Sequence, residues 1–188
     1  MVKAIKVMLI PNNVQKTKMF QYAGASRFAY NWALAREKEN YEKGGKFISD
    51  SELRKEFTKL RHSDEYAWLL NISNNVTKQA IKDACTAYKN FFKGLQKFPR
   101  FKSRKRSMPK FYQDNVKIQF SNTHVKFEGF SSSRKANKQK MNWVRLAEHG
   151  RIPTDVKYMN PRISFDGLNW WISVCAVSYT HLRAHETC

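Results

Sequence analysis

The spacing of apolar residues changes along the chain, and each change marks an expected element. An alternating pattern over residues 2–10 predicts a strand, and apolar residues three and four apart over 14–41 predict a long helix. Ser49 and Glu52 have the spacing of a capping box, so a short helix is expected from there to about residue 60. The chain therefore begins with one strand and then becomes helical.

The clearest helical pattern lies over residues 74–95. One face of this expected helix is largely apolar and consists of Thr77, Ile81, Ala84, Cys85, Tyr88, Phe91, Phe92 and Leu95. A neighbouring face carries ammonium groups and consists of Lys78, Lys82, Lys89 and Lys93. Because the two faces are adjacent, the helix can pack against a core while it presents a row of cations to a partner.

After Pro99 the pattern becomes alternating, which predicts short strands. These expected strands cover residues 116–120, 125–127, 142–146, 163–165 and 170–177. The order of strand, helices and strands favours an α+β fold, in which a small β-barrel is interrupted after its first strand by a helical domain. The first strand is expected to return to the barrel. The expected domains are residues 1–11, 12–97 and 98–177, followed by a tail over 178–188.

The charge of the chain indicates its partner. The 188 residues carry 35 Lys and Arg against 15 Asp and Glu, a net charge of +20, and residues 89–145 hold 16 basic and two acidic side chains. A solvated surface would mix both signs, and a membrane-binding segment would gather its cations on one amphipathic helix, so nucleic acid is the favoured partner. The apolar runs are too short to span a membrane, and the three cysteines are too far apart for a zinc pair or a disulfide framework. A cytoplasmic setting is expected.

Cations and aromatic rings alternate in the segment from Phe98 to Arg106. Arg binds phosphate through two parallel N–H bonds and rings stack on unpaired bases, so this segment predicts contact with nucleic acid. The expected contacts are Arg100, Lys102, Arg104, Lys105 and, further on, Lys110. Arg27 and Asn31 lie one turn apart on the apolar stripe of the first helix. Either protein groups satisfy them there, or they face a phosphate or a base edge.

The sequence contains no recognisable catalytic motif. Paired carboxylates in a known pattern, phosphate-binding glycine motifs and the HExxH zinc motif are all missing. His181 and His185 have helical metal-ligand spacing in the tail, where chance spacing is the favoured interpretation. We therefore expect no enzyme activity, no metal or other cofactor and no small-molecule substrate.

Three segments resemble the N-terminal half of the TnpB (OrfB) proteins of bacterial and archaeal insertion sequences. They are GASRFAYNWALAREKENYEKGG, AWLLNISNNVTKQAIKDACTAYKNFFKG and FPRFKSRKRS, and the similarity extends over residues 3–177. The resemblance implies a wedge-type, OB-like β-barrel interrupted by a helical recognition domain and followed, in the family, by a RuvC-like nuclease with a zinc ribbon. It also implies a guide RNA and duplex DNA with a short target-adjacent motif as partners.

The resemblance further implies roles for individual residues. Asn74 and Lys78, at the start of the 74–95 helix, would contact the DNA motif, since Asn can read adenine and Lys can contact guanine or phosphate. The RNA or the RNA–DNA duplex would lie along Arg100, Lys102, Arg104, Lys105 and Lys110. Gln113 and Asn115 would approach nucleic acid from the stretch that leads into the next strand.

The family's R-x-x-Y-N run corresponds to Arg27–Asn31, and its role would be mostly structural. The departure from the family lies after the last strand, where the first catalytic Asp in a G-[IV]-D-x-G motif is expected and SYTHLRAHETC stands instead. This tail resembles adapter-derived translation, so we expect it to be non-native and expect the chain to bind nucleic acid without cutting it. The alternative function is a helix-turn-helix DNA-binding accessory or regulator of transposition that acts without RNA.

Overall fold

The computed structural model describes residues 2–130 and 141–177, and the chain forms two compact units. The first unit consists of Met1–Lys16 and Gln113–Cys188, and the second of Thr17–Tyr112. None of the described helices is both long and apolar enough to cross a membrane.

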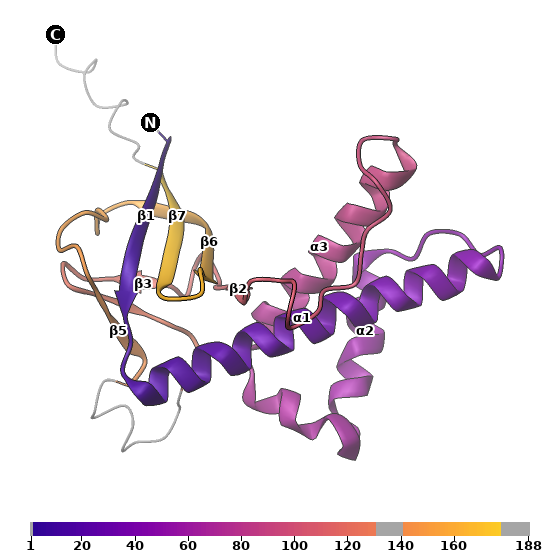
Figure 1. The fold of residues 1–188 in the computed structure, drawn as a ribbon, viewed down its shortest axis with the longest axis horizontal. Coiled ribbons are helices and arrows are strands. Elements are labelled where there is room, and N and C mark those ends of the chain that lie inside the picture. The colour runs from indigo at the N-terminus through magenta and orange to yellow at the C-terminus, as the bar shows by residue number, and fades with distance from the viewer. Residues whose placement is uncertain (1, 131–140, 178–188) are drawn as a thin grey trace, which may run out of the picture. The chain divides into compact units, whose positions relative to one another are not determined.

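The first unit contains an antiparallel sheet (Figure 1). Its strands are β1 (Val2–Ile10), β3 (Gln119–Phe120), β4 (His124–Lys126), β5 (Trp143–Leu146), β6 (Lys157–Phe165) and β7 (Trp170–Val177). They are hydrogen-bonded in the order β6-β7-β1-β5-β4-β3. Val2 lies opposite Val177 and Leu9 opposite Trp170, and Leu9 also lies opposite Leu146. The first strand therefore runs through the middle of a sheet whose other strands come from the C-terminal part of the chain, as expected.

One face of this sheet forms the core of the unit. The alternation that predicted β1 and β7 is confirmed, because the buried residues of these strands are Ile5, Val7, Leu9, Trp170, Ile172, Val174 and Ala176. The sheet curves, so that the ring centroids of Phe120 in β3 and Tyr158 in β6 lie 4.6 Å apart. The structure confirms an α+β fold with an open antiparallel sheet, whereas the wedge-type, OB-like barrel stays a prediction.

The strand expected over residues 116–120 is mostly a turn. Asp114 Oδ1 accepts hydrogen bonds from the backbone N–H groups of Val116 and Lys117, and Asp114 O accepts one from Ile118. An aspartate that binds the backbone ahead of it stabilises a turn against an extended strand. Only Gln119–Phe120 joins the sheet.

The C-terminal hairpin forms as expected, although its first strand begins at Lys157 instead of residue 163. Asp166 closes the turn by accepting hydrogen bonds from two backbone N–H groups. The segment 131–140 and the tail 178–188, with its two histidines, lie outside the described residues.

The second unit is mainly helical (Figure 1). Its elements are α1 (Asn13–Glu42), whose first residues belong to the first unit, α2 (Asp50–Arg61), the 3-10 helix η1 (Asp64–Asn71), α3 (Asn74–Phe92) and β2 (Lys110–Tyr112). The capping box is confirmed, because Ser49 Oγ accepts from the N–H of Glu52 and the Glu52 carboxylate accepts from the N–H of Ser49. The short strand β2 was not expected from the pattern.

The buried face of α1 differs from the stripe that three- and four-residue spacing predicts, which consists of Phe20, Gly24, Arg27, Asn31, Leu34 and Lys38. Its buried apolar side chains are Met19, Tyr22, Ala23, Ala25, Ala29, Tyr30, Ala33 and Leu34, whereas Phe20 is 44% exposed. The helix contacts neighbours on several sides. The Tyr22 ring lies 5.5 Å from the Phe111 ring in β2, and the Trp32 ring lies 5.1 Å from the Phe57 ring in α2. A helix packed on several sides has no single apolar stripe, which is why spacing alone gave the wrong face.

The expected packing face of α3 is confirmed over most of its length. Its buried members are Thr77, Ile81, Ala84, Cys85 and Tyr88. Phe92, the last residue of the helix, and Leu95, which lies beyond it, are 50% and 70% exposed. The helix ends at Phe92, and Gly94 follows it with a φ of +70°, a conformation that glycine adopts readily.

Candidate nucleic-acid interface

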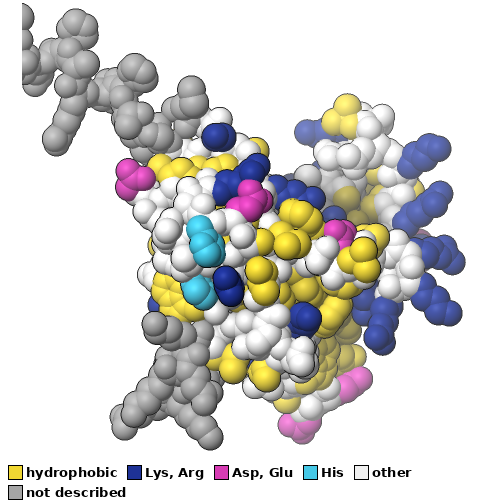
Figure 2. Space-filling model, turned by 60° about the vertical axis from the view of Figure 1, so that its left-hand side comes forward, with side chains coloured by type: hydrophobic (Ala, Val, Ile, Leu, Met, Phe, Trp, Pro, Cys, Tyr) yellow, Lys and Arg dark blue, Asp and Glu magenta, His cyan; other side chains and the backbone are white. Residues whose placement is uncertain are grey.

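Three exposed lysines of α3 and the exposed lysine that caps its C-terminus, together called the α3 lysine row, lie at the spacing that the sequence predicted: Lys78, Lys82, Lys89 and Lys93. Residues four and seven apart share one side of a helix, so the row lies beside the buried face. Lys89 Nζ lies 4.8 Å from the centroid of the Phe47 ring, which holds this ammonium near an aromatic face. Figure 2 shows Lys and Arg side chains gathered in a row along one edge, with Asp and Glu side chains outside that row.

The basic loop, residues 98–106, follows α3 and runs back along α1 (Figure 1). Its start is fixed by aromatic packing, since the Phe98 ring lies 5.2 Å from the Phe91 ring and 5.7 Å from the Tyr88 ring. Both contacts are edge-to-face, the arrangement that aromatic quadrupoles favour. The loop therefore leaves α3 from a fixed position.

A second fixed point lies in the middle of the loop. Asn31 Nδ2 donates to Lys102 O, and Lys102 N donates to Asn31 Oδ1, each at 2.8 Å. Lys102 Nζ also lies 3.3 Å from the centroid of the Tyr30 ring, and burial, followed by the charge of Asp83, raises the pKa of Tyr30. The pair of hydrogen bonds between Asn31 and the Lys102 backbone is called the clamp. Because its two bonds run in opposite directions, the clamp fixes both the position and the orientation of the loop backbone.

Beyond the clamp the loop makes one helical turn. Ser107 N donates to Ser103 O, and Arg106 N donates to Ser103 Oγ. Arg100, Arg104, Lys105 and Arg106 are all exposed. The protein thus holds the backbone on the inside and leaves these charged ends in solvent.

In the part of the chain that the structure describes, some cations on α1 and α2 are ion-paired, unlike the exposed cations of the basic loop and of α3. Arg36 of α1 is paired with Glu39 and Glu56. By contrast, residues 84–113 include nine basic side chains and no acidic one. Within the described ranges, no carboxylate forms an ion pair with Lys78, Lys82, Lys89, Lys93, Arg100, Arg104 or Lys105. Like charges without counter-charges attract a polyanion.

Three amides expected to contact nucleic acid bind the backbone of this chain. Asn31 binds the backbone of Lys102, which agrees with the interpretation that protein groups satisfy this side chain. Gln113 is 1% exposed, and its Oε1 accepts from the N–H of Glu128 at 2.9 Å. Asn115 Oδ1 accepts from the N–H of Asn160 at 2.9 Å. A direct contact of these amides with nucleic acid stays a prediction, and burial of Gln113 argues against one there.

The other expected contact residues are accessible to different degrees. Asn74 and Lys78 are exposed in the first turn of α3, and Lys110 is exposed at the start of β2. Arg27 is half-buried and lines a groove beside α1. The structure thus leaves the three exposed residues free to reach a large ligand.

Arg61 is a positioning residue that the sequence analysis missed. It is buried, and its Nη2 donates to Leu69 O at 2.9 Å and to Ile72 O at 3.2 Å. Burial lowers the pKa of its guanidinium. The signal was present, since Arg61 follows Leu53 and Phe57 at four-residue intervals on the apolar face of α2. It holds η1 in place.

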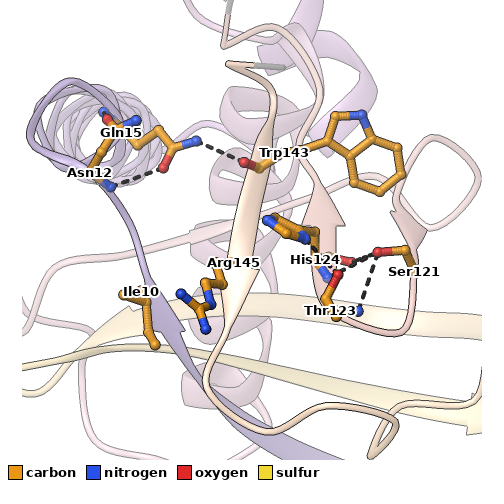
Figure 3. Close-up of a pocket in the computed structure, with 8 residues that line it drawn as sticks. All are labelled: Ile10, Asn12, Gln15, Ser121, Thr123, His124, Trp143 and Arg145. Carbon is orange, nitrogen blue, oxygen red and sulfur yellow. Dashed lines mark hydrogen bonds between the residues drawn. The ribbon is translucent and has the colours of Figure 1, made fainter. Parts of the chain in front are cut away.

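The first unit contains a cavity of about 710 Å³ (Figure 3). Its lining residues are Ile10, Asn12, Gln15, Ser121, Thr123, His124, Trp143 and Arg145. Gln15 Nε2 donates to the backbone oxygens of Met141 and Trp143, and Ser121 Oγ accepts from two backbone N–H groups. Most of these polar atoms therefore hold the chain's own segments together. No group of His, Cys, Asp and Glu in the described ranges is arranged to hold a metal ion.

Comparison with protein families gives a match at the N-terminus. The family model HTH_OrfB_IS605, described as a helix-turn-helix domain, matches residues 1–46. In that range the structure contains the strand β1 and the single continuous helix α1. The description of the family and the elements within the matched residues therefore differ.

Two curated relatives align with almost all of the chain. It is 30% identical over 185 residues to the "Putative RNA-guided DNA endonuclease InsQ" of Escherichia coli (strain K12), covering 98% of this chain and 43% of the relative. It is 24% identical over 172 residues to a "Putative RNA-guided DNA endonuclease" of Streptomyces pristinaespiralis, covering 92% of this chain and 40% of the relative. The chain thus spans about two-fifths of the length of these relatives. From the N-terminal match and these two alignments, the chain belongs to the TnpB/OrfB family of insertion-sequence proteins.

Proposed function

We propose that this chain is the nucleic-acid-binding part of a TnpB-like RNA-guided DNA endonuclease. It holds a guide RNA and the short motif beside the DNA target, and it contributes no catalytic residue of its own. The observation that carries this proposal is the basic loop. Its backbone is fixed to α1 and α3, while Arg100, Arg104 and Lys105 project from it without a partner carboxylate among the described residues.

The physical basis is electrostatic attraction between a fixed row of cations and phosphates. Arg can bind a phosphate through two parallel N–H bonds, and each neutralised phosphate releases condensed counterions. Because the clamp at Asn31 orders the loop before binding, less conformational entropy is lost when the ligand arrives. The α3 lysine row supplies further charge within the same unit.

Recognition of the DNA motif is assigned to the first turn of α3. Asn74 and Lys78 are exposed there and lie four residues apart, so their side chains point to the same side. An Asn amide can make two hydrogen bonds to adenine, and a Lys can reach guanine or a phosphate. Replacing either by Ala is expected to weaken binding to motif-containing duplex more than binding to bulk RNA.

The alternative function is a DNA-binding accessory that acts without RNA. The description of the matched family as a helix-turn-helix domain favours it. The single continuous helix within residues 1–46 favours the first proposal. RNA that copurifies with the chain and is removed by ribonuclease supports the first proposal, and RNA-free protein that shifts duplex DNA supports the alternative.

A charge-matched pair of variants tests the first proposal. One removes Arg100, Arg104 and Lys105 of the basic loop by substitution with Ala. The control removes three exposed lysines that lie outside both basic surfaces: Lys46, Lys55 and Lys59. Both variants lose the same net charge, so a difference between them reports the position of the charges.

The measurement is the salt dependence of RNA affinity. For 6–10 phosphate contacts, wild-type affinity is expected to fall by ~10³–10⁵ between 50 and 200 mM salt. Loss of three contacts reduces the slope of log K against log salt by ~2–3 in the loop variant, and the control retains nearly the wild-type slope. A flat wild-type response, or equal slopes for both variants, refutes the proposal.

A further inference from the structure

A groove of about 490 Å³ lies between α1 and η1 in the second unit. Its lining includes Lys18, Gln21, Gly24 and Arg27 from α1, with Trp68 and Asn71 from η1. Its size falls in the range of small-molecule sites, which are typically ~300–1,000 Å³. It is separate in sequence from the basic loop and from the α3 lysine row.

The polar side of the groove is cationic. Lys18 and Arg27 are half-buried, and none of the lining residues is acidic. Among the described residues, neither cation forms an ion pair with a carboxylate. The exposed amides of Gln21 and Asn71 supply both donors and acceptors. These groups fit an anion that also carries hydrogen-bonding edges.

The other side of the groove is aromatic and held in place. Trp68 is 45% exposed, and its ring lies 5.7 Å from the Phe28 ring in an edge-to-face contact. Phe28 in turn stacks on Tyr66 at 5.5 Å. Arg61 binds the end of η1 through Leu69 O and Ile72 O. The indole is therefore positioned by its neighbours while much of its surface faces solvent.

Gly24 gives an independent indication of a ligand. It lies inside α1, where glycine is less favourable than alanine, and it does not have a positive φ. A Cβ added at Gly24 would meet no atom within 4 Å. The packing of this chain therefore does not require glycine there, whereas a ligand that approaches the helix backbone would.

We propose that this groove binds one unpaired nucleotide of the bound nucleic acid. Its base stacks on Trp68, its phosphate lies at Lys18 and Arg27, and the amides contact the base edge. The inference rests on the proposed function, since the nucleotide belongs to the RNA or DNA that the second unit binds. It adds a site for a base outside a duplex to the phosphate contacts proposed for the cations of the basic loop.

The test uses the full chain and two probes, a short single-stranded RNA and an RNA duplex of the same length. Trp68→Ala removes the stacking surface, and Gly24→Leu fills the groove. The matched control is Leu70→Ala, which changes an exposed residue of η1 outside the groove lining.

Trp68→Ala is expected to weaken single-strand binding by ~10- to 100-fold and to leave duplex binding within about twofold, as expected for loss of base stacking. Gly24→Leu should have the same selectivity, and the Leu70→Ala control should bind like wild type. A single-stranded RNA carrying 2-aminopurine should lose fluorescence on binding to wild type and keep it with Trp68→Ala. Competition by adenosine 5′-monophosphate would show that the groove also accepts a free nucleotide, and its absence would show that the strand is needed.

The outcomes separate the two proposals. If wild type binds both probes and Trp68→Ala binds each probe as tightly as wild type does, the groove proposal fails and the proposed function stands. Equal losses on both probes also overturn the groove proposal. If wild type binds neither probe, both proposals fail. Circular dichroism of Gly24→Leu checks its fold, and Trp68→Ala keeps the test decisive should that variant unfold.

Discussion

Replacing Asn31 by Ala would test whether one side chain sets the path of the basic loop. The substitution removes both 2.8 Å hydrogen bonds to the backbone of Lys102. A hydrogen bond contributes ~1 kcal/mol net, so two contribute ~2 kcal/mol. Asn31 is half-buried, and water replaces part of the loss, which leaves an expected cost of ~1–2 kcal/mol.

The assay is hydrogen exchange of the Lys102 amide, which the Asn31 oxygen protects directly. A cost of ~1–2 kcal/mol corresponds to ~5- to 30-fold faster exchange of this amide in the Asn31→Ala variant. RNA affinity should fall by no more than the same factor, because the loop must first regain its bound conformation. Val14→Ala, an exposed position on the same helix, is the control.

Asn31→Asp sharpens the test, because a carboxylate accepts the Lys102 N–H but cannot donate to Lys102 O. Exchange of the Lys102 amide in this variant should be slower than in Asn31→Ala at neutral pH, because one of the two hydrogen bonds remains. It should approach the wild-type rate at acidic pH, where a protonated carboxyl can also donate to Lys102 O. If Lys102 exchange in Asn31→Ala stays within about twofold of wild type, the side chain does not fix the loop and the argument for a preformed interface is wrong.

Three further predictions concern single groups. Burial, followed by nearby carboxylates, raises the pKa of the Cys85 thiol to about 12, so at pH 8 iodoacetamide should label half-buried Cys175 and leave Cys85 unlabelled in peptide mapping. Because the folded pKa lies above the reference value of 9.0, the stability linked to this proton is complete below pH 9 and declines as pH rises towards 12. Hydrogen bonds from the backbone N–H of Asn169 and then from two other N–H groups lower the pKa of Asp166 to about 2. The linked stability of the hairpin is therefore present above pH 3.8 and is lost as the pH falls towards 2. Tryptophan fluorescence should show this change in wild type and not in Asp166→Asn. Gly24→Ala should raise the free energy of unfolding by ~0.5–1 kcal/mol in urea titration, since alanine favours the helix and its Cβ meets no atom within 4 Å; a lower value would show hidden strain.

The parts of the fold that follow from local spacing could be predicted from the sequence. Alternation located β1 and β7, and the capping box located α2. The apolar and cationic stripes in the sequence correctly located the buried face of α3 and the lysine row beside it. The strand expected over 116–120 failed because a single hydrogen-bonding group, the Asp114 carboxylate, competes with the sheet. Alternation of side chains carries no information about that competition.

The candidate site could be predicted only in part. The exposed cations of the basic loop were identifiable from composition, because a run without acidic residues has no local counter-charge. The function of Asn31 could not be derived, since its partner Lys102 is far away in sequence and comes close only in the folded chain. The same holds for the groove, which needs η1 to lie beside α1 before Trp68 and Arg27 face one space.

The central position of β1 has a consequence for how the protein is made. This strand leaves the ribosome before the helical unit, yet its main partner β7 is translated only at residues 170–177. The helical unit is complete much earlier, at Tyr112. During translation, β1 must therefore wait as an unpaired strand while the helices fold, and sheets with such distant pairing form slowly. Ribosome-bound chains stalled before β7 should have protected helices and an N-terminal strand open to protease.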